Sequence, residues 1–269
     1  FYLDHGLPVG RFAVIASEAE LARAIEDLGG RTFVKVARGG YDGRGQFETA
    51  SAADAAEAFA ALGRERCVVE QAVAIEHEIS VLVARGPSGE LACYPPALNH
   101  HEQRILAWSV LPAPIEPALE ARAIELARTL CEKLAIVGLC CVEMFVVGGD
   151  LLINEIAPRP HNSYHASFVG CLTSQFEQHV RSVCGLPLGS TEVVRPAAIC
   201  NLLGDLWQGG QTPAFDRALA IDGVRVHLYG KSGARPGRKM GHLSATGPTV
   251  AEAIDKVKRA QALLAPAST

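Results

Sequence analysis

The chain has 269 residues, with 25 Lys or Arg against 29 Asp or Glu, which gives a formal net charge of −4. This weak acidity excludes a nucleic-acid binder driven by bulk positive charge, because such proteins neutralise backbone phosphates with an excess of Lys and Arg. Hydrophobic residues make up 49% and charged residues 20%, so the composition is that of a globular protein and excludes a disordered or collagen-like chain.

Cysteine usage and hydropathy bear on where the protein works. The eight cysteines lie mostly in apolar segments and never as a C-x-x-C pair, which argues against a zinc cage or a disulfide scaffold. No apolar stretch reaches the ~18 residues of a membrane helix, since Glu143 and Asp150 interrupt the most apolar region. We expect a cytoplasmic protein with reduced thiols and no membrane partner. The chain begins at Phe1 without an initiator methionine, and we expect an upstream segment to be missing.

Strand-like and helix-like segments alternate from the start of the chain, which predicts an α/β or α+β architecture. In the first part, Ser17 and Glu20 form a capping box that begins a helix. The order predicted for this part is helix 17–28, strand 31–37, strand 47–50 and helix 51–62. The glycine-rich segment 38–46 joins the two strands as a hairpin flap, so residues 1–66 are predicted to form a small α/β unit.

The remaining elements divide into a central subdomain at 67–189 and a C-terminal domain at 190–269. Pro117 begins a long helix that Gly138 is predicted to end, and residues 185–189 form a linker. The other predicted elements are strands 67–71 and 79–85, a hairpin of 139–147 and 151–156, strands 196–203 and 224–228, and a helix that begins at Thr249.

The hairpin places acidic side chains opposite each other. A three-residue loop centred on Gly149 pairs Glu143 with Glu155, whereas a two-residue loop pairs Glu143 with Asn154. Side chains that face each other in an antiparallel pair lie ~4.5–5.5 Å apart at their β-carbons, so two carboxylates there repel unless a cation lies between them. Oxygen donors of this kind are typical Mg²⁺ ligands, and we predict a magnesium site on this hairpin.

The flap admits two interpretations. Four glycines within seven residues leave backbone N–H groups free to approach phosphate oxygens, but glycine-rich hairpin tips are also often plain turns. Lys35 favours phosphate binding, because a charge in the strand that enters the flap is unfavourable without an anion.

Two other groups of charged residues have a functional and a plain interpretation. Glutamates near strand ends at Glu70 and Glu78 could bind ribose hydroxyls or simply be solvated. The basic cluster of Lys231, Arg238 and Lys239 could bind a phosphomonoester, or form a solvated loop, which we favour without further context. The adjacent His100 and His101 point to opposite faces of a strand, so at most one of them enters a site. The sequence contains no nucleophile elbow, which argues against covalent serine or cysteine catalysis.

Several motifs together resemble the ATP-grasp superfamily, and within it the 5-(carboxyamino)imidazole ribonucleotide synthases. The motifs are the flap Gly-Gly-Tyr-Asp-Gly-Arg-Gly over 39–45, the segment 70–78, and Asn-Glu-Ile-Ala-Pro-Arg-Pro-His-Asn-Ser over 154–163. Further matches cover 173–179, 184–189, 229–231 and 238–242. Tyr164 and Leu98 depart from the family's pattern near the expected acceptor site.

The resemblance implies an α+β ATP-grasp fold, in which a small α/β lid subdomain joins a larger antiparallel-sheet subdomain, with a small C-terminal β-rich domain. It implies an ATP-dependent carbon–nitrogen ligase, in which bicarbonate accepts the γ-phosphoryl group and the carboxyphosphate carboxylates 5-aminoimidazole ribonucleotide. The family also carries an N-terminal domain that contributes to subunit contacts, so we expect a homodimer if that domain is present.

The resemblance also assigns roles to matching positions. The expected nucleotide-binding residues are Lys35, Gly39, Gly40, Tyr41, Asp42, Gly43, Arg44, Gly45, Glu70, Gln71, Ala72, Val73, Glu78, His101, Asn154 and Glu155. Two Mg²⁺ ions are expected at Glu143, Glu155 and Asn154. The expected acceptor-binding residues are Tyr41, Asp42, His161, Asn162, Ser163, Lys231, Arg238 and Lys239, with catalytic roles for Asp42, Arg159 and Lys231. The alternatives are an ATP-grasp ligase with another acceptor, and a noncatalytic nucleotide-binding module.

Overall fold

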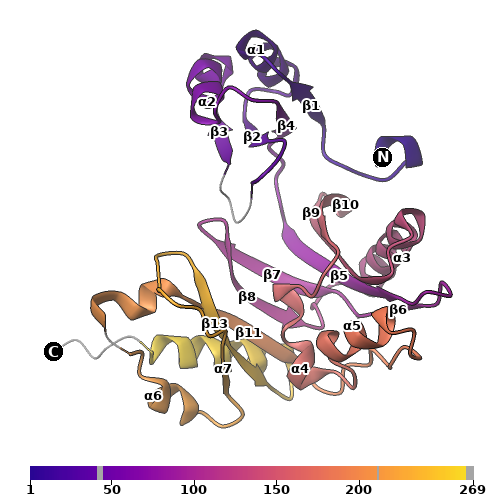
Figure 1. Ribbon diagram of the computed structural model, residues 1–269, viewed down its shortest axis with the longest axis vertical. Coiled ribbons are helices and arrows are strands. Elements are labelled where there is room, and N and C mark those ends of the chain that lie inside the picture. The colour runs from indigo at the N-terminus through magenta and orange to yellow at the C-terminus, as the bar shows by residue number, and fades with distance from the viewer. Residues whose placement is uncertain (41–44, 211, 265–269) are drawn as a thin grey trace. The chain divides into compact units, whose positions relative to one another are not determined.

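The computed structural model describes residues 1–40, 45–210 and 212–264, and it divides into two compact units, Phe1–Glu76 and His77–Thr269 (Figure 1). The predicted site residues Tyr41, Asp42, Gly43 and Arg44 lie outside the described residues. Each unit is described below by itself.

The first unit is an antiparallel sheet with two α-helices. Its described strands run in the order β1 (Phe12–Ile15), β4 (Cys67–Gln71), β2 (Thr32–Val36) and β3 (Gln46–Thr49). The helical segments are η1 (Leu3–His5), α1 (Glu18–Asp27), η2 (Ala52–Asp54) and α2 (Ala55–Ala61). The predicted caps are present: the Ser17 hydroxyl accepts the Glu20 N–H, and Ser51 and Asp54 form a capping box.

The strand Cys67–Gln71 belongs to this first sheet, which corrects its assignment to the central subdomain. It lies between β1 and β2, with Val69 paired to Ala13 on one side and to Val34 on the other. Val69 and Val34 are fully buried together with Leu21 and Ile25 of α1. The strand follows the second helix in the chain, and for that reason it was assigned to the next subdomain. Its apolar face, however, completes the core beneath the two helices of the first unit.

The second unit is built on one long sheet. Its nine described strands are β5 (His77–Arg85), β6 (Leu91–Cys93), β7 (Ala97–Glu102), β8 (Ile105–Leu111), β9 (Gly138–Val147), β10 (Asp150–Ala157), β11 (Ala197–Leu203), β12 (Arg225–Leu228) and β13 (Lys239–Thr246). They run in the order β10-β9-β5-β7-β8-β11-β13-β12, and β6 pairs with β5. The helical segments are α3 (Pro117–Leu134), η3 (Asn162–Tyr164), α4 (Ser167–Gly170), α5 (Gln175–Val183), η4 (Gly204–Gly210), α6 (Phe215–Leu219) and α7 (Val250–Ala262).

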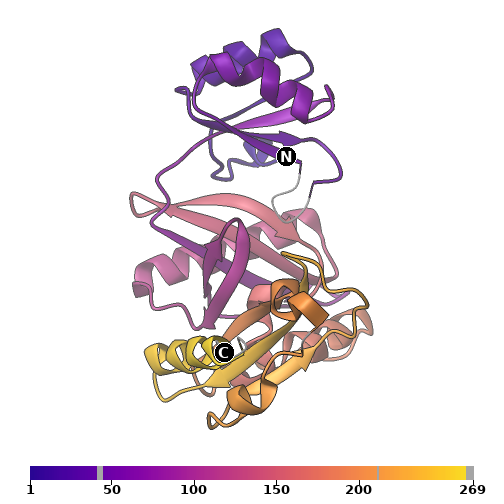
Figure 2. The same cartoon turned by 90° about the vertical axis from the view of Figure 1, so that its left-hand side faces the viewer.

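Strands from the predicted C-terminal domain continue the sheet of the central subdomain. β11 pairs with β8, with Ala197 opposite Leu111 and Cys200 opposite Trp108. Helix α3 packs on β5 and β9, and the C-terminal helix α7, yellow in Figure 2, packs on β8, β11 and β13. Hydrogen bonds therefore join strands from either side of residue 189. The division of residues 67–269 at 189/190 stays a prediction.

Two predictions about side chains and helix ends have clear outcomes. All eight cysteines are free thiols, as predicted. Helix α3 begins at Pro117 as expected, but it ends at Leu134 because Ala135 adopts a left-handed conformation with φ of 50°. Gly138, which was predicted to end this helix, is the first residue of β9.

Among the described residues, no helix has the length and apolar composition needed to cross a membrane.

The β9–β10 hairpin has a two-residue turn, and a β-bulge changes its register. Gly148 and Gly149 form the turn with φ of 58° and 77°, and Asp150 pairs with Val147, so the predicted three-residue loop is wrong. That register alone would put Asn154 opposite Glu143. The bulge between Ile153 and Glu155 shifts the pairing by one residue, so Glu155 faces Glu143 as predicted.

Tyr164, one of the two departures from the family pattern, is fully buried in the core of the second unit. Its ring lies edge-on to Tyr94 at 5.7 Å, and its hydroxyl donates to the backbone oxygens of Ser80 at 2.7 Å and Pro95 at 2.9 Å. The side chain therefore fills the core.

We predict that Tyr164→Phe lowers the free energy of unfolding by about 1–3 kcal/mol, because two backbone oxygens lose this donor in a dry interior. Urea denaturation followed by tryptophan fluorescence would measure this difference. An unchanged unfolding midpoint would contradict the structural role given to the hydroxyl.

Candidate functional site

An acidic centre lies at the bulge of the β9–β10 hairpin in the second unit. Glu143, Glu155 and His161 each offer a ligand atom, and these three atoms lie within 4.8 Å of one another. The hairpin supplies both glutamates, and the loop that follows β10 supplies the histidine. The bulge at Asn154 is what turns Glu155 toward Glu143, so a local irregularity of the strand creates the centre.

The two glutamates differ in environment. The Glu143 side chain is only 14% exposed, whereas Glu155 is an exposed residue. Burial, and after it the negative charge of Glu155, raise the pKa of Glu143 to about 7 against the opposing positive charge of His101. A cation placed between the two carboxylates would favour the ionised form of Glu143.

His161 is a neutral histidine beside Glu143. Its Nε2 lies 3.3 Å from Glu143 Oε1. Burial lowers the pKa of His161 to about 3, with a further contribution from the positive charge of Arg159, so the ring is uncharged at neutral pH. The contact is therefore one between a neutral ring and a carboxyl group, and not an ion pair. Arg159 itself is exposed, and its guanidinium donates to the backbone oxygen of Pro160 at 3.0 Å.

The backbone around His161 is held by Gln175, the first residue of α5. The Gln175 side-chain oxygen accepts the His161 N–H at 2.8 Å, and its amide donates to the His161 carbonyl at 2.9 Å. Both polar atoms of the neighbouring Asn162 side chain are buried without a hydrogen-bond partner among the described residues. A buried amide that lacks partners is unfavourable, so Asn162 offers a donor and an acceptor to a ligand.

Glu78 and His101 form a second polar pair in this unit. Glu78 Oε2 of β5 lies 2.7 Å from His101 Nδ1 of β7. Burial lowers the pKa of His101, but the hydrogen bond and charge of Glu78 outweigh that effect and leave the pKa raised. His100 instead stacks on Trp108 with ring centroids 4.9 Å apart, so only one of the adjacent histidines takes part in the pair.

The basic cluster is connected to the acidic centre through Lys239. Its positive charge lowers the pKa values of Glu143 and His161, which places it within electrostatic reach of both. Lys231 donates to the Lys239 carbonyl at 2.8 Å, with its ammonium 5.3 Å from the Tyr229 ring centroid. Arg238 donates to the carbonyl of Gly233 at 2.8 Å, so its guanidinium braces the loop.

In the first unit, Lys35 has an anionic partner within the unit. Its ammonium lies 2.6 Å from Glu70 Oε2, and both side chains are about one-third exposed. The carboxylate explains how a lysine is accommodated in this strand, so the charge of Lys35 alone does not require a phosphate. The N–H of Ala72 is bonded to the Arg31 carbonyl, and the N–H of Gln71 to the Arg11 carbonyl.

Two described glycines of the flap adopt left-handed backbone conformations. Gly39 and Gly45 have φ of 78° and 72°, and a β-carbon at Gly45 would approach Val36 to 2.6 Å. Gly40 lies in irregular backbone beside Gly39, and Val73 lies in irregular backbone after β4.

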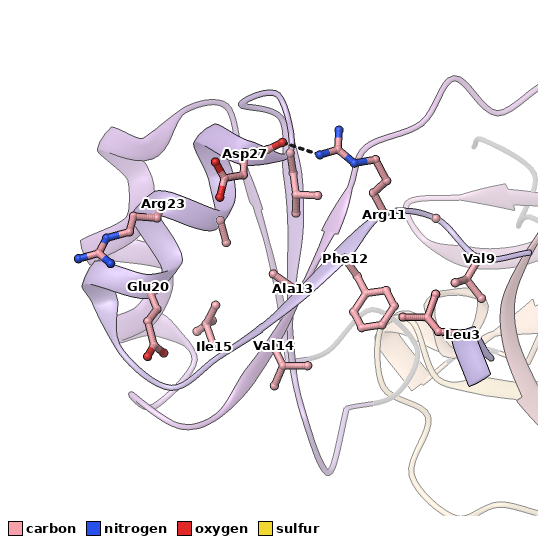
Figure 3. Close-up of a pocket in the computed structure, with 13 residues that line it drawn as sticks. Leu3, Val9, Arg11, Phe12, Ala13, Val14, Ile15, Glu20, Arg23 and Asp27 are labelled. Carbon is pink, nitrogen blue, oxygen red and sulfur yellow. Dashed lines mark hydrogen bonds between the residues drawn. The ribbon is translucent and has the colours of Figure 1, made fainter. Parts of the chain in front are cut away.

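A cavity of about 660 Å³ also lies in the first unit, between β1 and α1 (Figure 3). Exposed apolar side chains such as Phe12 and Val14 line it, together with Arg11, whose guanidinium donates to the Asp27 carbonyl at 2.8 Å. None of the described residues that the sequence assigned to a site lines this cavity.

Sequence reasoning missed the polar side chains that support the acidic centre. Ser80, Asn99 and Gln175 are buried and hydrogen-bonded around His161 or Ser163. Ser80 and Asn99 carry no signal of their own, because each sits alone in an apolar or mixed strand. Gln175 falls in the matched segment 173–179, which is the signal that could have indicated it.

The chain matches known proteins over both of its units. Residues 1–176 match the model of the ATP-grasp domain, and residues 197–256 match that of the phosphoribosylaminoimidazole carboxylase C-terminal domain. The chain is 41% identical over 240 residues to the N5-carboxyaminoimidazole ribonucleotide synthase of Bacillus subtilis. That alignment covers 89% of this chain, and the chain spans 62% of the length of the Bacillus protein.

Solved structures agree with this similarity. An ADP complex of an N5-carboxyaminoimidazole ribonucleotide synthetase is 39% identical, with a TM-score of 0.89 over 96% of this chain and 68% of that chain. A synthase from Aspergillus clavatus, in complex with ADP and 5-aminoimidazole ribonucleotide, is 31% identical, with a TM-score of 0.86 over 98% of this chain and 70% of that chain. The predicted ATP-grasp fold is confirmed, and this chain belongs to the N5-carboxyaminoimidazole ribonucleotide synthase family of ATP-grasp proteins.

Proposed function

We propose that this chain carries out the ATP-dependent carboxylation of 5-aminoimidazole ribonucleotide by bicarbonate. The observation that carries the proposal is the acidic centre, in which Glu143 and Glu155 face each other beside the neutral His161 and within electrostatic reach of Lys239. The names of the relatives support this substrate, as does the Aspergillus structure with ADP and 5-aminoimidazole ribonucleotide.

The proposed reaction has two steps. A bicarbonate oxygen attacks the γ-phosphorus of ATP, ADP leaves, and carboxyphosphate forms. The exocyclic amine then attacks the carboxyl carbon and loses a proton, while inorganic phosphate leaves. Both steps build or move negative charge, so fixed positive groups and N–H donors, together with the exclusion of water, would do most of the catalysis.

Magnesium is the cation that fits the acidic centre best. Glu143 and Glu155 offer carboxylate oxygens, and Asn154 in the bulge offers an amide oxygen, which are ligands that Mg²⁺ prefers. Burial and the charge of Glu155 raise the pKa of Glu143 against the opposing charges of His101 and Lys239, so a bound cation would favour its ionised form. Two Mg²⁺ ions bound there would neutralise charge on the ATP phosphates.

The remaining roles are proposed on the family resemblance and the local geometry. Lys35, the flap 39–45, the segment 70–73, Glu78 and His101 are proposed to bind the nucleotide. His161, Asn162, Ser163, Lys231, Arg238 and Lys239 are proposed to bind the acceptor and the carboxyphosphate, with catalytic roles for Lys231, Arg159 and Asp42. Because Glu70 and Glu78 each hold a cationic or imidazole partner, a nucleotide hydroxyl would join or replace those contacts. Homodimer formation stays a prediction.

We expect ATP hydrolysis by this chain to depend on both bicarbonate and 5-aminoimidazole ribonucleotide. Phosphate release would be measured with each cosubstrate omitted in turn. A rate of hydrolysis that does not depend on either compound would contradict the proposed reaction and favour an ATP-grasp ligase with another acceptor. Nucleotide binding without any turnover would favour a noncatalytic module.

We predict that Glu155→Gln weakens Mg²⁺-dependent ADP binding by about tenfold or more, because the pair loses one of its two anionic ligands. Calorimetric titration with ADP, in Mg²⁺ and in EDTA, would measure the difference. Glu192→Gln is a matched control, since Glu192 is exposed and is not part of the acidic centre. Equal affinities for the wild type and Glu155→Gln would rule out this cation site.

Glu143→Gln should change how stability depends on pH in the metal-free protein. The pKa of Glu143 is about 7 in the folded state, above its ordinary value of 4.5, so the folded state binds this proton more tightly than the unfolded state. The proton on Glu143 therefore stabilises the folded state, fully below pH 4.5 and no longer once the pH has risen through 7. Over that pH range the free energy of unfolding of the wild type should fall by on the order of 3 kcal/mol relative to that of Glu143→Gln. Chemical denaturation in EDTA at several pH values would show this, and parallel pH profiles would contradict it.

A further inference from the structure

A chain of buried polar side chains in the second unit ends on the ring of His161. We infer that this chain fixes the tautomer of His161 that carries its proton on Nε2, which makes His161 an N–H donor in the acidic centre and excludes it as a cation ligand. The inference rests on the proposed function only for the identity of the anion and cation that occupy the centre.

The chain of hydrogen bonds runs through three side chains. Asn99 is 6% exposed, and Ser80 and Ser163 are fully buried. The Asn99 amide donates to Ser80 Oγ at 3.1 Å, and the Ser80 hydroxyl donates to Ser163 Oγ at 2.8 Å. The Ser163 hydroxyl lies 2.8 Å from His161 Nδ1. The Ser163 hydroxyl has one proton and two possible acceptors, Nδ1 at 2.8 Å and the Cys141 sulfur at 3.9 Å. Nitrogen is the stronger acceptor and the nearer one, so Ser163 donates to Nδ1.

The other end of the ring leads to the same tautomer. A neutral imidazole carries a single proton, so the ring that accepts from Ser163 at Nδ1 carries that proton on Nε2. The opposite tautomer would direct the Nε2 lone pair at Glu143 Oε1 across 3.3 Å, which is repulsive when that carboxyl group is ionised. A proton on Nε2 converts the same contact into a hydrogen bond.

The position of the ring is fixed independently of this chain. Gln175 bonds to both the N–H and the carbonyl of His161, as described above. The Ser109 hydroxyl donates to the Ser163 carbonyl at 2.7 Å, which holds the backbone that presents Ser163. Ser182 of α5 is also fully buried, and its hydroxyl donates to the His179 carbonyl at 2.9 Å and to no member of the chain that reaches Nδ1, so it serves as a matched control.

This tautomer defines what each group of the acidic centre does. A nitrogen that carries a proton has no lone pair for a metal ion, so the cation is left to oxygen donors, which suits Mg²⁺. When a cation engages the carboxylates, the Nε2–H can donate to an anionic oxygen of a ligand. In the proposed reaction that ligand is bicarbonate or carboxyphosphate, and Asn99, Ser80 and Ser163 act as positioning residues.

The tautomer can be read directly by nuclear magnetic resonance. Protein labelled with ¹⁵N at its nine histidines would be recorded in two-bond ¹H–¹⁵N correlation spectra, with His161 assigned by its absence from the spectrum of His161→Gln. We expect a protonated Nε2 and an unprotonated Nδ1, unchanged on addition of Mg²⁺ and ADP. A protonated Nδ1, or a metal-induced loss of the Nε2 proton, would overturn the inference.

Two variants test the role of the serine chain. Ser163→Ala removes the donor to Nδ1, so we expect the minor tautomer to rise from undetectable to about a tenth of the population or more. Ser80→Ala, which keeps Ser163, should give a smaller rise. Ser182→Ala should leave the wild-type tautomer in place, and thermal unfolding would show that each variant is folded. A wild-type spectrum for Ser163→Ala, or an equal change in Ser182→Ala, would overturn the role of this chain.

The test separates the inference from the proposed function. A protein that shows the Nε2 tautomer without bicarbonate-dependent turnover would refute the reaction and leave the tautomer assignment intact. A protein that turns over as proposed while Nδ1 carries the proton would refute only the inference.

Discussion

The site depends on the repulsion between two carboxylates that the backbone holds face to face. Glu143 and Glu155 lie opposite each other only because a β-bulge at Asn154 shifts the register set by the two-residue turn. Burial of Glu143 makes the repulsion strong, since the surrounding protein screens charge less well than water does. A bound divalent cation removes that repulsion, so a geometry that is unfavourable for two carboxylates alone favours cation binding.

The polar groups around the acidic centre come from distant parts of the chain and meet because of the sheet order. β5 lies between β9 and β7, so Ser80 pairs with Glu143 on one side and with Ala97 on the other. The loop after β10 then brings His161 and Ser163 over these strands. Each buried hydroxyl and amide in this network needs its partner, because an unpaired polar group is unfavourable in a dry interior. The network therefore supports a single orientation of the His161 ring.

Local sequence rules predicted what local interactions determine. The capped helices and the proline that begins α3 are of this kind. The pairing of Glu143 with Glu155 is not, because it was expected from a three-residue loop and arises instead from a bulge after a two-residue turn. The bulge was not predicted, because nothing in the residues around Asn154 distinguishes it from an ordinary strand. The place of Cys67–Gln71 in the first sheet and the union of β8 with β11 are set by long-range packing, which residue periodicity does not encode. The family was predicted from the resemblance of its motifs. The hydrogen bonds of Ser80 and Asn99 near the acidic centre could be found only from the structure.

Diffraction from crystals grown with Mn²⁺ and ADP would test the central claim most directly, because anomalous scattering locates the metal without reference to neighbouring atoms. We expect a metal peak within ~2.5 Å of a carboxylate oxygen of both Glu143 and Glu155, with His161 outside the coordination shell. A metal bound to nucleotide phosphates but to neither glutamate, or to only one of them, would contradict the account.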